Sequence, residues 1–539
     1  MPKSLVNASI LLLLLGSAVP PVAATCTGDC NANGSVTIEE LVQGVSIALG
    51  NATTALCPAF DANGNGAVTV DELVAAVGAA LEGCPATATP AADTPTVPPT
   101  EVVPTPTASA VDTDTPTPTA TPTATATSGP FLRFCDLPGS VQFTERGKVV
   151  IPGGGPDLRW LELPAGFCAH YYGRVGNVRQ LRFAPGGELF AASPSTLTTG
   201  GRGDLGLDAI MVLPDDDRDG FADGNLTFLD RLPSPLNPLD LVPLASTQGL
   251  LFANGFFYFQ DHTRIMRVPY ASGDRTPSGP AEQVVDIGRN TGRFQDSLHW
   301  PKVLDMADDG TIYVGNGGTQ SDPCVAGHPF RGGILKIDGT PGGAEVAKGF
   351  RNPIAIRCVR GFNRCFAIEL ARDYTANIGG REKLVPIREG DDWGHPCCAT
   401  AKQPYPDIAP VPDCSEVDSE GGAFVIGHTP FDLDFAPSSW PPPWNNRVYV
   451  PMHGVFATWE GARVVSIGMD PITGEVLMGS ELPAQDPGSL LEFAAGWDDG
   501  PRGEGPHGRP ANIAFAPDGR MFLGNDNTGD IIWIAPLGL

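Results

Sequence analysis

The stretch "KVLDMADDGTIYVGN", residues 302–316, has the pattern of a strand, a tight turn and a second strand. An Asp-Gly pair supplies the turn, and aliphatic and aromatic residues on both sides are typical of strands. The same phrase occurs five more times, as "QLRFAPGGELFAAS" from Gln180, "QGLLFANGFFYFQD" from Gln248, "IAIRCVRGFNRCFAIE" from Ile354, "FDLDFAPSSWPPPWNNRVYVPMHG" from Phe431 and "NIAFAPDGRMFLGND" from Asn512.

Six copies at irregular spacings of roughly 50 to 80 residues predict propeller blades with loops inserted on one face. We therefore expect residues 131–539 to form a mainly β domain, a six-bladed β-propeller. A β-sandwich is the alternative, but it does not explain the repeat.

The first part of the chain predicts export and a separate small module. Residues 1–24 combine Lys3, the apolar run "ILLLLLGSAV" and the small residues "VAA", which is typical of a signal peptide. The apolar run is shorter than the ~20 residues of a membrane span, so a retained anchor is the lesser alternative. Residues 86–130 are rich in proline and threonine and predict a disordered, extended linker after a module at 25–85.

Charge and cysteine content point to the same compartment. The formal net charge of −27 argues against nucleic acid and against an anionic membrane surface. No later segment predicts a membrane span, so we expect a secreted, periplasmic or cell-surface protein. Four cysteines precede residue 90 and eight follow residue 130, so each half can close its own disulfides. Cys358 pairs best with Cys365, whereas adjacent Cys397 and Cys398 are expected to find partners such as Cys414 or Cys324.

The small module contains an internal repeat with calcium-loop spacing. "DCNANGSVTIEE" starts at Asp29 and "DANGNGAVTVDE" starts at Asp61, and each has glycine at loop position 6 and glutamate at position 12. An ordinary Asx-rich turn is the alternative for a single copy, but two copies in register argue against it. The candidate ligands are Asp29, Asn31, Asn33, Ser35, Thr37 and Glu40 in the first loop, and Asp61, Asn63, Asn65, Ala67, Thr69 and Glu72 in the second.

Each loop is followed by an amphipathic helical pattern, and the pair precedes a Pro/Thr linker. This loop–helix repeat resembles a type I dockerin, a family that binds cohesin domains. The resemblance implies a tether to a cohesin-like or surface partner. The four cysteines of the module depart from many dockerins.

Polar residues stand just ahead of three of the repeated phrases. His299 precedes the third phrase, Arg351 and Asn352 precede the fourth, and Arg509 precedes the sixth. Because propellers bring equivalent strand ends to one central mouth, these side chains are expected to gather in one pocket. A blade salt bridge is the alternative for each arginine, and core packing is the alternative for His299.

The segments "GFRNPIAI", "AIELA", "REKLVPIREGDDWGHPCC" and "GRPANIAFAPDGRMFLGND" resemble the glucose/sorbosone dehydrogenase family over most of residues 160–539. Characterised members are six-bladed propellers that use pyrroloquinoline quinone, a quinone with three carboxylates, together with calcium. The resemblance implies oxidation of a sugar hydroxyl by hydride transfer to the quinone.

The resemblance also implies roles for individual residues. Arg351, Asn352 and Arg509 would bind the quinone, and His299 would be the base, titrating near ~6.5. Backbone carbonyls of Leu370 and Ala371, after Glu369, would bind calcium, and Glu382 matches a further acid of that loop. Departures from the family are Gly318, where an aspartate near the base is expected, Ala511 in place of a second arginine, and "HGVF" at 453–456. We expect the change at Gly318 to leave the imidazole less well oriented.

Two questions stay open at the level of the sequence. The acidic run "DDDRDGFAD", residues 215–223, predicts either a calcium-stapled turn or a solvated hairpin tip. A non-catalytic carbohydrate- or protein-binding propeller and a calcium-dependent lactone hydrolase are alternatives to the dehydrogenase. The non-catalytic binding propeller follows if Arg351 and Arg509 pair with acids on separate blades. The lactone hydrolase needs several carboxylates around one calcium.

Overall fold

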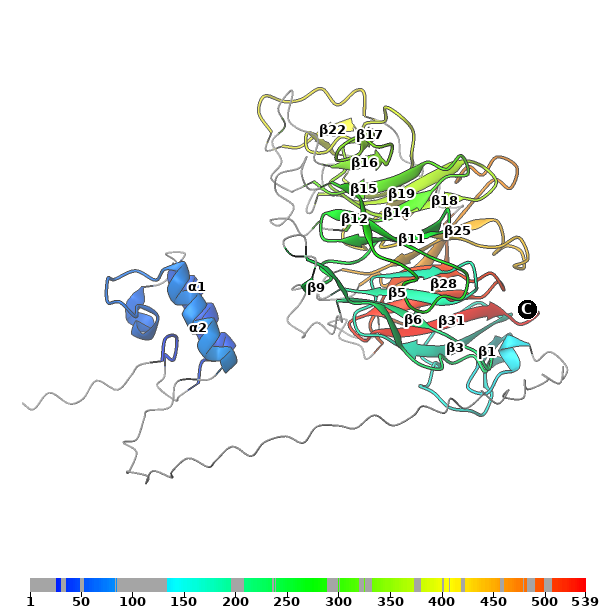
Figure 1. Ribbon diagram of the computed structural model, residues 1–539, viewed down its shortest axis with the longest axis horizontal. Coiled ribbons are helices and arrows are strands. Elements are labelled where there is room, and N and C mark those ends of the chain that lie inside the picture. Colours follow the sequence, from blue (N-terminus) through cyan, green and yellow to red (C-terminus); the bar gives the residue numbers. More distant parts are fainter. Residues whose placement is uncertain are drawn as a thin grey trace, which may run out of the picture. The chain divides into compact units, whose positions relative to one another are not determined.

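The computed structural model falls into two compact units, Met1–Thr123 and Ala124–Leu539 (Figure 1). It describes residues 26–30, 35–48, 53–82, 84, 133–194, 208–234, 237, 239–287, 299, 301–318, 324, 332–372, 380–399, 402–406, 408–417, 422–455, 460–477, 479–481, 490–498 and 507–539. The proposed signal peptide and the linker at 86–130 lie outside the described residues. In the described part of the chain, no helix is long and apolar enough to cross a membrane.

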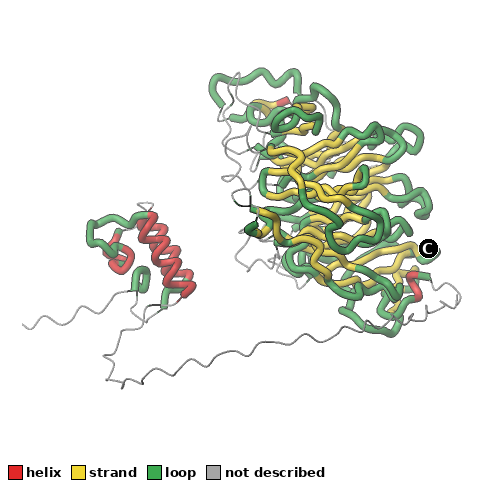
Figure 2. Tube along the Cα trace, viewed as in Figure 1, coloured by secondary structure: helices red, strands yellow, loops and turns green. Residues whose placement is uncertain are grey.

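The N-terminal unit is built from two helices, α1 (Ile38–Ala48) and α2 (Val70–Glu82), with two short 3-10 turns between them (Figure 2). Its small core surrounds the fully buried ring of Phe60. Gly44 of α1 lies so close to this ring that an added Cβ would come within 2.3 Å of it. The disulfides Cys26–Cys84 and Cys30–Cys57 fasten the unit, since a module of this size buries little apolar surface.

The C-terminal unit is a six-bladed β-propeller, which confirms the prediction from the repeat and excludes the sandwich. Blade 1 contains β4 (Gln180–Phe183), β5 (Leu189–Ser193), β6 (Ala209–Leu213) and β7 (Leu226–Leu229), and blade 2 contains β10 (Leu250–Ala253), β11 (Phe256–Asp261), β12 (Arg264–Pro269) and β13 (Glu282–Asp286). Blade 3 contains β14 (Leu304–Met306), β15 (Ile312–Asn316), β16 (Gly333–Lys336) and β17 (Ala344–Lys348), and blade 4 contains β18 (Asn352–Val359), β19 (Arg364–Leu370), β20 (Glu382–Pro386), β23 (Gly422–Phe424) and β27 (Gly479–Ser480).

Blade 5 contains β24 (Asp434–Phe435), β25 (Arg447–Met452), β26 (Arg463–Gly468) and β28 (Leu490–Ala494). Blade 6 contains β29 (Arg509–Phe515), β30 (Met521–Asp526), β31 (Asp530–Pro536), β3 (Phe167–Arg174), β1 (Val141–Thr144) and β2 (Gly147–Val150). Two hairpins lie outside the blades, β8 (Arg231–Pro233) with β9 (Leu241–Pro243), and β21 (Cys398–Ala399) with β22 (Gln403–Pro404).

Each repeated phrase forms the first two strands of its blade. In blade 3 the phrase places Leu304 opposite Val314, and the turn between the strands uses Gly310 at φ 89°. That dihedral is in the left-handed region, where glycine is the default residue. The first strands of successive blades contact one another from β18 through β14, β10, β4 and β29 to β24.

Blade 6 closes the ring because it joins both ends of the domain. β3 pairs antiparallel with β31 from Phe167 opposite Pro536 to Arg174 opposite Asp530. The Cys135–Cys168 disulfide ties the segment before β1 to the same blade. This pairing holds the two ends of the domain in one sheet and so closes the ring of blades.

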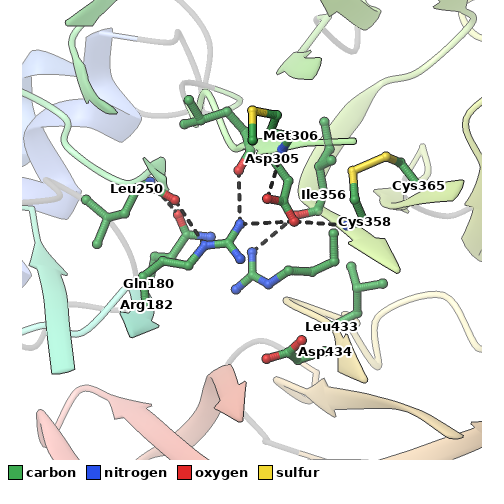
Figure 3. A network of polar contacts seen from close by, with 12 residues as sticks. Gln180, Arg182, Leu250, Asp305, Met306, Ile356, Cys358, Cys365, Leu433 and Asp434 are labelled. Carbon is green, nitrogen blue, oxygen red and sulfur yellow. Dashed lines mark hydrogen bonds and ion pairs between the residues drawn. A yellow bond between two sulfur atoms is a disulfide. The ribbon is translucent and has the colours of Figure 1, made fainter. Parts of the chain in front are cut away.

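The backbone N–H groups at the inner edges of the blades form hydrogen bonds with side chains of neighbouring blades. Side-chain oxygens accept backbone N–H groups of the next first strand, in the pairs Gln180–Leu250, Asp305–Cys358, Asp432–Ile513 and Asp434–Phe515. Arg182 donates to the Leu250 and Leu304 carbonyls, each at 3.0 Å, and lies beside Asp305 (Figure 3). This network replaces the strand partner that an inner strand lacks on its open side.

The remaining disulfides agree with the sequence prediction. Cys358 and Cys365 lie directly opposite each other on β18 and β19 and are bonded. Cys397 and Cys398 do not bond each other but form the bridges Cys324–Cys397 and Cys398–Cys414. Each half of the chain closes its own bridges, and no described cysteine is left as a free thiol.

Candidate active site

His299 lies ahead of β14 with its imidazole buried and held by one backbone carbonyl. Its Nδ1 is 2.5 Å from the Gly318 oxygen. A carbonyl can only accept, so Nδ1 carries the proton and Nε2 keeps the lone pair. The Gly318 backbone carbonyl thus helps to orient the ring, although glycine offers no side-chain carboxylate at this position.

The same backbone segment joins His299 to Arg351. The Gly318 amide donates to the Arg351 carbonyl at 2.7 Å. A Cβ on the neighbouring Gly317 would lie 2.5 Å from the Cβ of His299 and 3.4 Å from the Arg351 carbonyl oxygen. The close approach of these two residues therefore depends on a position without a side chain.

Arg351 is anchored on blade 4. Its backbone amide donates to Glu369 Oε1 at 2.9 Å, and its guanidinium Nη1 donates to the Ala371 carbonyl at 2.9 Å. The Ala371 amide in turn donates to Glu382 Oε2 at 2.7 Å. Glu369 forms an ion pair with Lys383. Arg351 thus lies against the chain segment after Glu369 that the resemblance marks as a calcium loop.

Burial and neighbouring charge shift two pKa values in this cluster. Burial, and after it the charge of Arg351, lower the pKa of His299 to about 3. The imidazole is therefore neutral near pH 7, and the expected titration near ~6.5 is wrong for this chain without ligands. Burial raises the pKa of Glu382 to about 8, so that this carboxyl is largely protonated near neutral pH.

Exchanging Glu382 for glutamine is expected to change how stability depends on pH. The pKa of this group is higher in the folded chain than in the unfolded chain, so its contribution is full below about pH 4.5 and is lost as pH rises through 8. The wild type should lose stability relative to Glu382→Gln between about pH 5 and pH 8, by on the order of 1 kcal/mol per pH unit, and no further above that range. Urea unfolding of both proteins at several pH values measures this difference, and parallel curves would contradict it.

Asn352 begins β18 beside this cluster. Its side chain is buried, and its Oδ1 forms no hydrogen bond with any described residue. Trp393, in the "DDWGHP" motif, is buried too, and its indole Nε1 is likewise unbonded within the described part of the chain. Because an unsatisfied buried polar atom is costly, both atoms indicate a missing polar partner.

Arg509 belongs to a second buried network on blade 6. Its Nε and Nη2 reach Asp526 at 3.1 and 3.0 Å, and His453 Nε2 lies 2.6 Å from the same carboxylate. Arg179 lies 3.6 Å from Asp526 and over the ring of Phe431. Burial alone would raise the pKa of Asp526, but His453 and Arg509 hold it well below its usual range.

The two networks approach each other along one face of the ring. Glu382 Oε1 accepts the Gly427 amide at 3.3 Å, and two residues later the Thr429 carbonyl accepts the His453 amide at 2.8 Å. A series of contacts thus runs from His299 through blades 4 and 5 to Arg509. The structure brings His299, Arg351 and Asn352 together with the Leu370–Ala371 segment, and it places Arg509 further along this face with Asp526 as its partner.

The sequence missed several members of these networks. Arg179 stands ahead of the first repeated phrase just as Arg351 stands ahead of the fourth, so the repeat itself could have indicated it. His395, in the quoted "DDWGHP" motif, and Lys302 both lie close enough to His299 to lower its pKa. Asp526 ends a strand of the sixth phrase, and no local pattern distinguishes it.

Side-chain oxygens of the module's second loop accept hydrogen bonds from its backbone amides. Asp61 accepts the amides of Asn65 and Gly66 at 2.9 and 2.7 Å. Glu72 accepts the amides of Thr69 and Asn63 at 2.9 and 3.3 Å, so it also caps α2. In the first loop Glu40 accepts the amides of Cys30 and Thr37, whereas Asn31 and Asn33 lie outside the described residues.

The C-terminal unit therefore defines a six-bladed propeller with a buried His–Arg cluster on one face. Among solved structures, the chain is similar to a Trichoderma reesei protein of the Carbohydrate-Active Enzymes Family AA12 in its iodide form, with TM-score 0.53, 15% identity and coverage of 70% of this chain and 97% of that one. It is also similar to the holo form of the pyranose dehydrogenase PQQ domain from Coprinopsis cinerea, with TM-score 0.51, 14% identity and coverage of 71% and 98%. At this identity the likeness establishes the fold. No family model and no curated protein matches the sequence.

Proposed function

We propose that the propeller is a quinone-dependent sugar dehydrogenase that is exported and tethered through its N-terminal module. The observation that carries this proposal is that His299, whose Nδ1 faces the Gly318 carbonyl, lies near Arg351 and near Asn352, whose buried Oδ1 forms no hydrogen bond among the described residues. The fold shared with a PQQ domain and a carbohydrate-active family supports the same class of substrate and cofactor.

The charges of this face suit an anionic cofactor. Arg351, Arg179 and Arg509 are cations, whereas Asp526 is ionised and Glu382 is largely protonated near pH 7. The carboxylates of pyrroloquinoline quinone would bind Arg351, with Arg509 as a second candidate, and Asn352 would bond a polar atom of the ring system. When bound, the quinone would supply an acceptor for the hydride that leaves the sugar carbon.

His299 would take the proton of the sugar hydroxyl on Nε2, while the Gly318 carbonyl holds Nδ1–H. Burial, and after it the positive charge of Arg351, lower the pKa of His299 and make its imidazole a weak base. A carboxylate bound to Arg351 would offset that charge and raise the basicity of His299. Cofactor binding would thus prepare the base for its task.

A calcium site at Leu370 and Ala371 fits the described geometry less well. The Ala371 carbonyl accepts a hydrogen bond from the Arg351 guanidinium, and a divalent cation on that oxygen would lie beside another cation. The proposed proton transfer to His299 does not depend on a metal at this position.

Reconstitution tests the proposed function. The purified chain would be titrated with pyrroloquinoline quinone, with and without calcium, and dye reduction would be followed with a panel of aldoses. Saturable quinone binding with sugar-dependent dye reduction is expected. Absence of quinone binding would overturn the proposal.

A non-catalytic carbohydrate- or protein-binding propeller is the second candidate. The observation in its favour is the bidentate contact between Arg509 and Asp526, which gives one proposed cofactor arginine a protein partner. Sugar binding without quinone binding in the same titration would support this candidate. For a lactone hydrolase, several carboxylates should converge at the mouth, and within the described residues the one such group lies at 215–223 instead.

We also propose that the N-terminal module binds two calcium ions and docks on a cohesin-like or surface partner. Glu40→Gln with Glu72→Gln should remove about two sites from a calcium titration of the full chain, because glutamine can still cap the helices but loses the bidentate charge. Asp71→Asn, on an exposed neighbour in α2, is the matched control and should keep both sites. Calorimetry measures the stoichiometry, and an unchanged value in the double variant would contradict the assignment.

A further inference from the structure

The connection between β6 and β7 brings together three carboxylates that the proposed reaction does not use. Asp215, Asp217 and Asp223 each offer one oxygen, and these oxygens lie within 4.8 Å of one another. Asp223 and Asp217 accept backbone amides of the same loop, from Asp216 and Asp219, but these bonds do not offset the repulsion between like charges at this distance.

Asp215 adds an independent indication of a ligand. Its side chain is only 9% exposed, and its Oδ2 lies 3.7 Å from Arg520 Nη1. Its Oδ1 is buried and forms no hydrogen bond with the described residues, although the Gly220 amide lies near the carboxylate. Because Oδ2 faces Arg520, Oδ1 is the oxygen left for a ligand. A buried carboxylate oxygen without a donor costs free energy that a bound cation would recover.

The connection is anchored on blade 6 rather than projecting into solvent. Trp533 of β31 donates its indole N–H to the Gly220 carbonyl at 2.9 Å, and the Ala222 amide donates to the Tyr172 carbonyl of β3 at 2.7 Å. Gly220 has φ 94°, and an added Cβ would lie 3.2 Å from the Trp533 ring. A segment of blade 1 thus lies against the strands that close the ring.

We propose that residues 215–223 bind a calcium ion that fastens blade 1 to blade 6. Asp215 Oδ1 and the carboxylates of Asp217 and Asp223 would be the side-chain ligands, with backbone carbonyls and water completing the shell. Calcium suits a flexible, carboxylate-rich loop better than magnesium, which requires near-octahedral geometry and retains its water. The ion would act where the two ends of the propeller meet, independently of the proposed dehydrogenase reaction.

Terbium luminescence of the full chain tests this site. Residues 25–85 contain neither tryptophan nor tyrosine, so the N-terminal module has no such donor of its own for terbium bound there. Trp533 contacts the proposed loop and should sensitise terbium bound there. We expect saturable luminescence that calcium displaces and that the double variant Asp217→Asn, Asp223→Asn loses, with at least a roughly tenfold fall in affinity.

Asp216→Asn is the matched control, because Asp216 lies in the same loop but its carboxylate pairs with Arg275. This variant should keep terbium binding and a calcium-induced rise of the propeller Tm, and the double variant should lose both. Both exchanged aspartates are exposed, so folding is expected to be retained and circular dichroism would verify it. Equal luminescence and equal Tm shifts in the wild type and the double variant would overturn the proposal.

Discussion

Replacement of His299 by glutamine is expected to lower kcat of the quinone-loaded protein by roughly 10²- to 10⁴-fold, the usual contribution of a positioned general base. Glutamine can still donate to the Gly318 carbonyl, so quinone binding and the fold should persist. The loss should appear in kcat rather than in KM, because the proton transfer belongs to the chemical step. Dye-reduction kinetics, with quinone binding measured in parallel, distinguish a loss in kcat from a change in KM or in cofactor binding.

His170→Gln is the control for loss of a buried, carbonyl-bound imidazole. His170 lies on blade 6, and its two ring nitrogens face the Tyr171 and Pro138 carbonyls. This exchange should lower Tm but leave kcat of the folded protein near the parental value. A parental rate in His299→Gln would show that the base lies elsewhere, and an unfolded His299→Gln chain would assign the residue a structural role.

Exchange of Arg351 for methionine is expected to weaken binding of pyrroloquinoline quinone by roughly 30- to 3,000-fold. Loss of one partner from a buried, hydrogen-bonded charge pair typically costs about 2–5 kcal/mol, and ~1.4 kcal/mol corresponds to tenfold in Kd. Arg351→Lys should recover only part of the affinity, since an ammonium retains the charge but lacks the planar fork. The quinone Kd, measured by fluorescence titration, is the readout.

Arg447→Lys provides the comparison for removing a guanidinium from the propeller interior. Arg447 is buried on blade 5 and bonds to Ser466, so this exchange should leave quinone affinity unchanged. Arg351→Met should also raise the pKa of His299, because the guanidinium charge contributes to its depression. Unaltered quinone affinity in Arg351→Met would remove the main cofactor contact from the proposal.

Local sequence predicted several residues of the candidate site but not the contacts that hold them. Motif matching indicated His299, Arg351 and Asn352, which lie together, but it could not indicate that the Gly318 carbonyl holds the imidazole. Nor could it show that Arg509 faces Asp526 and His453, since these residues meet only when β29, β30 and β25 pack together. Burial is the largest cause of the pKa shifts of His299 and Glu382, and burial is a property of the packed chain.

The sequence was enough to predict the propeller, because each strand–turn–strand phrase carries its own alternation and turn residues and the phrase occurs six times. It also determined the disulfide at Cys358 and Cys365, which a single hairpin places opposite each other. The sequence did not predict that Gln180 and Asp305 accept backbone amides of neighbouring blades, or that the loop at 215–223 packs on Trp533. Those contacts join residues far apart in the chain, and their partners are chosen by ring closure rather than by local pattern.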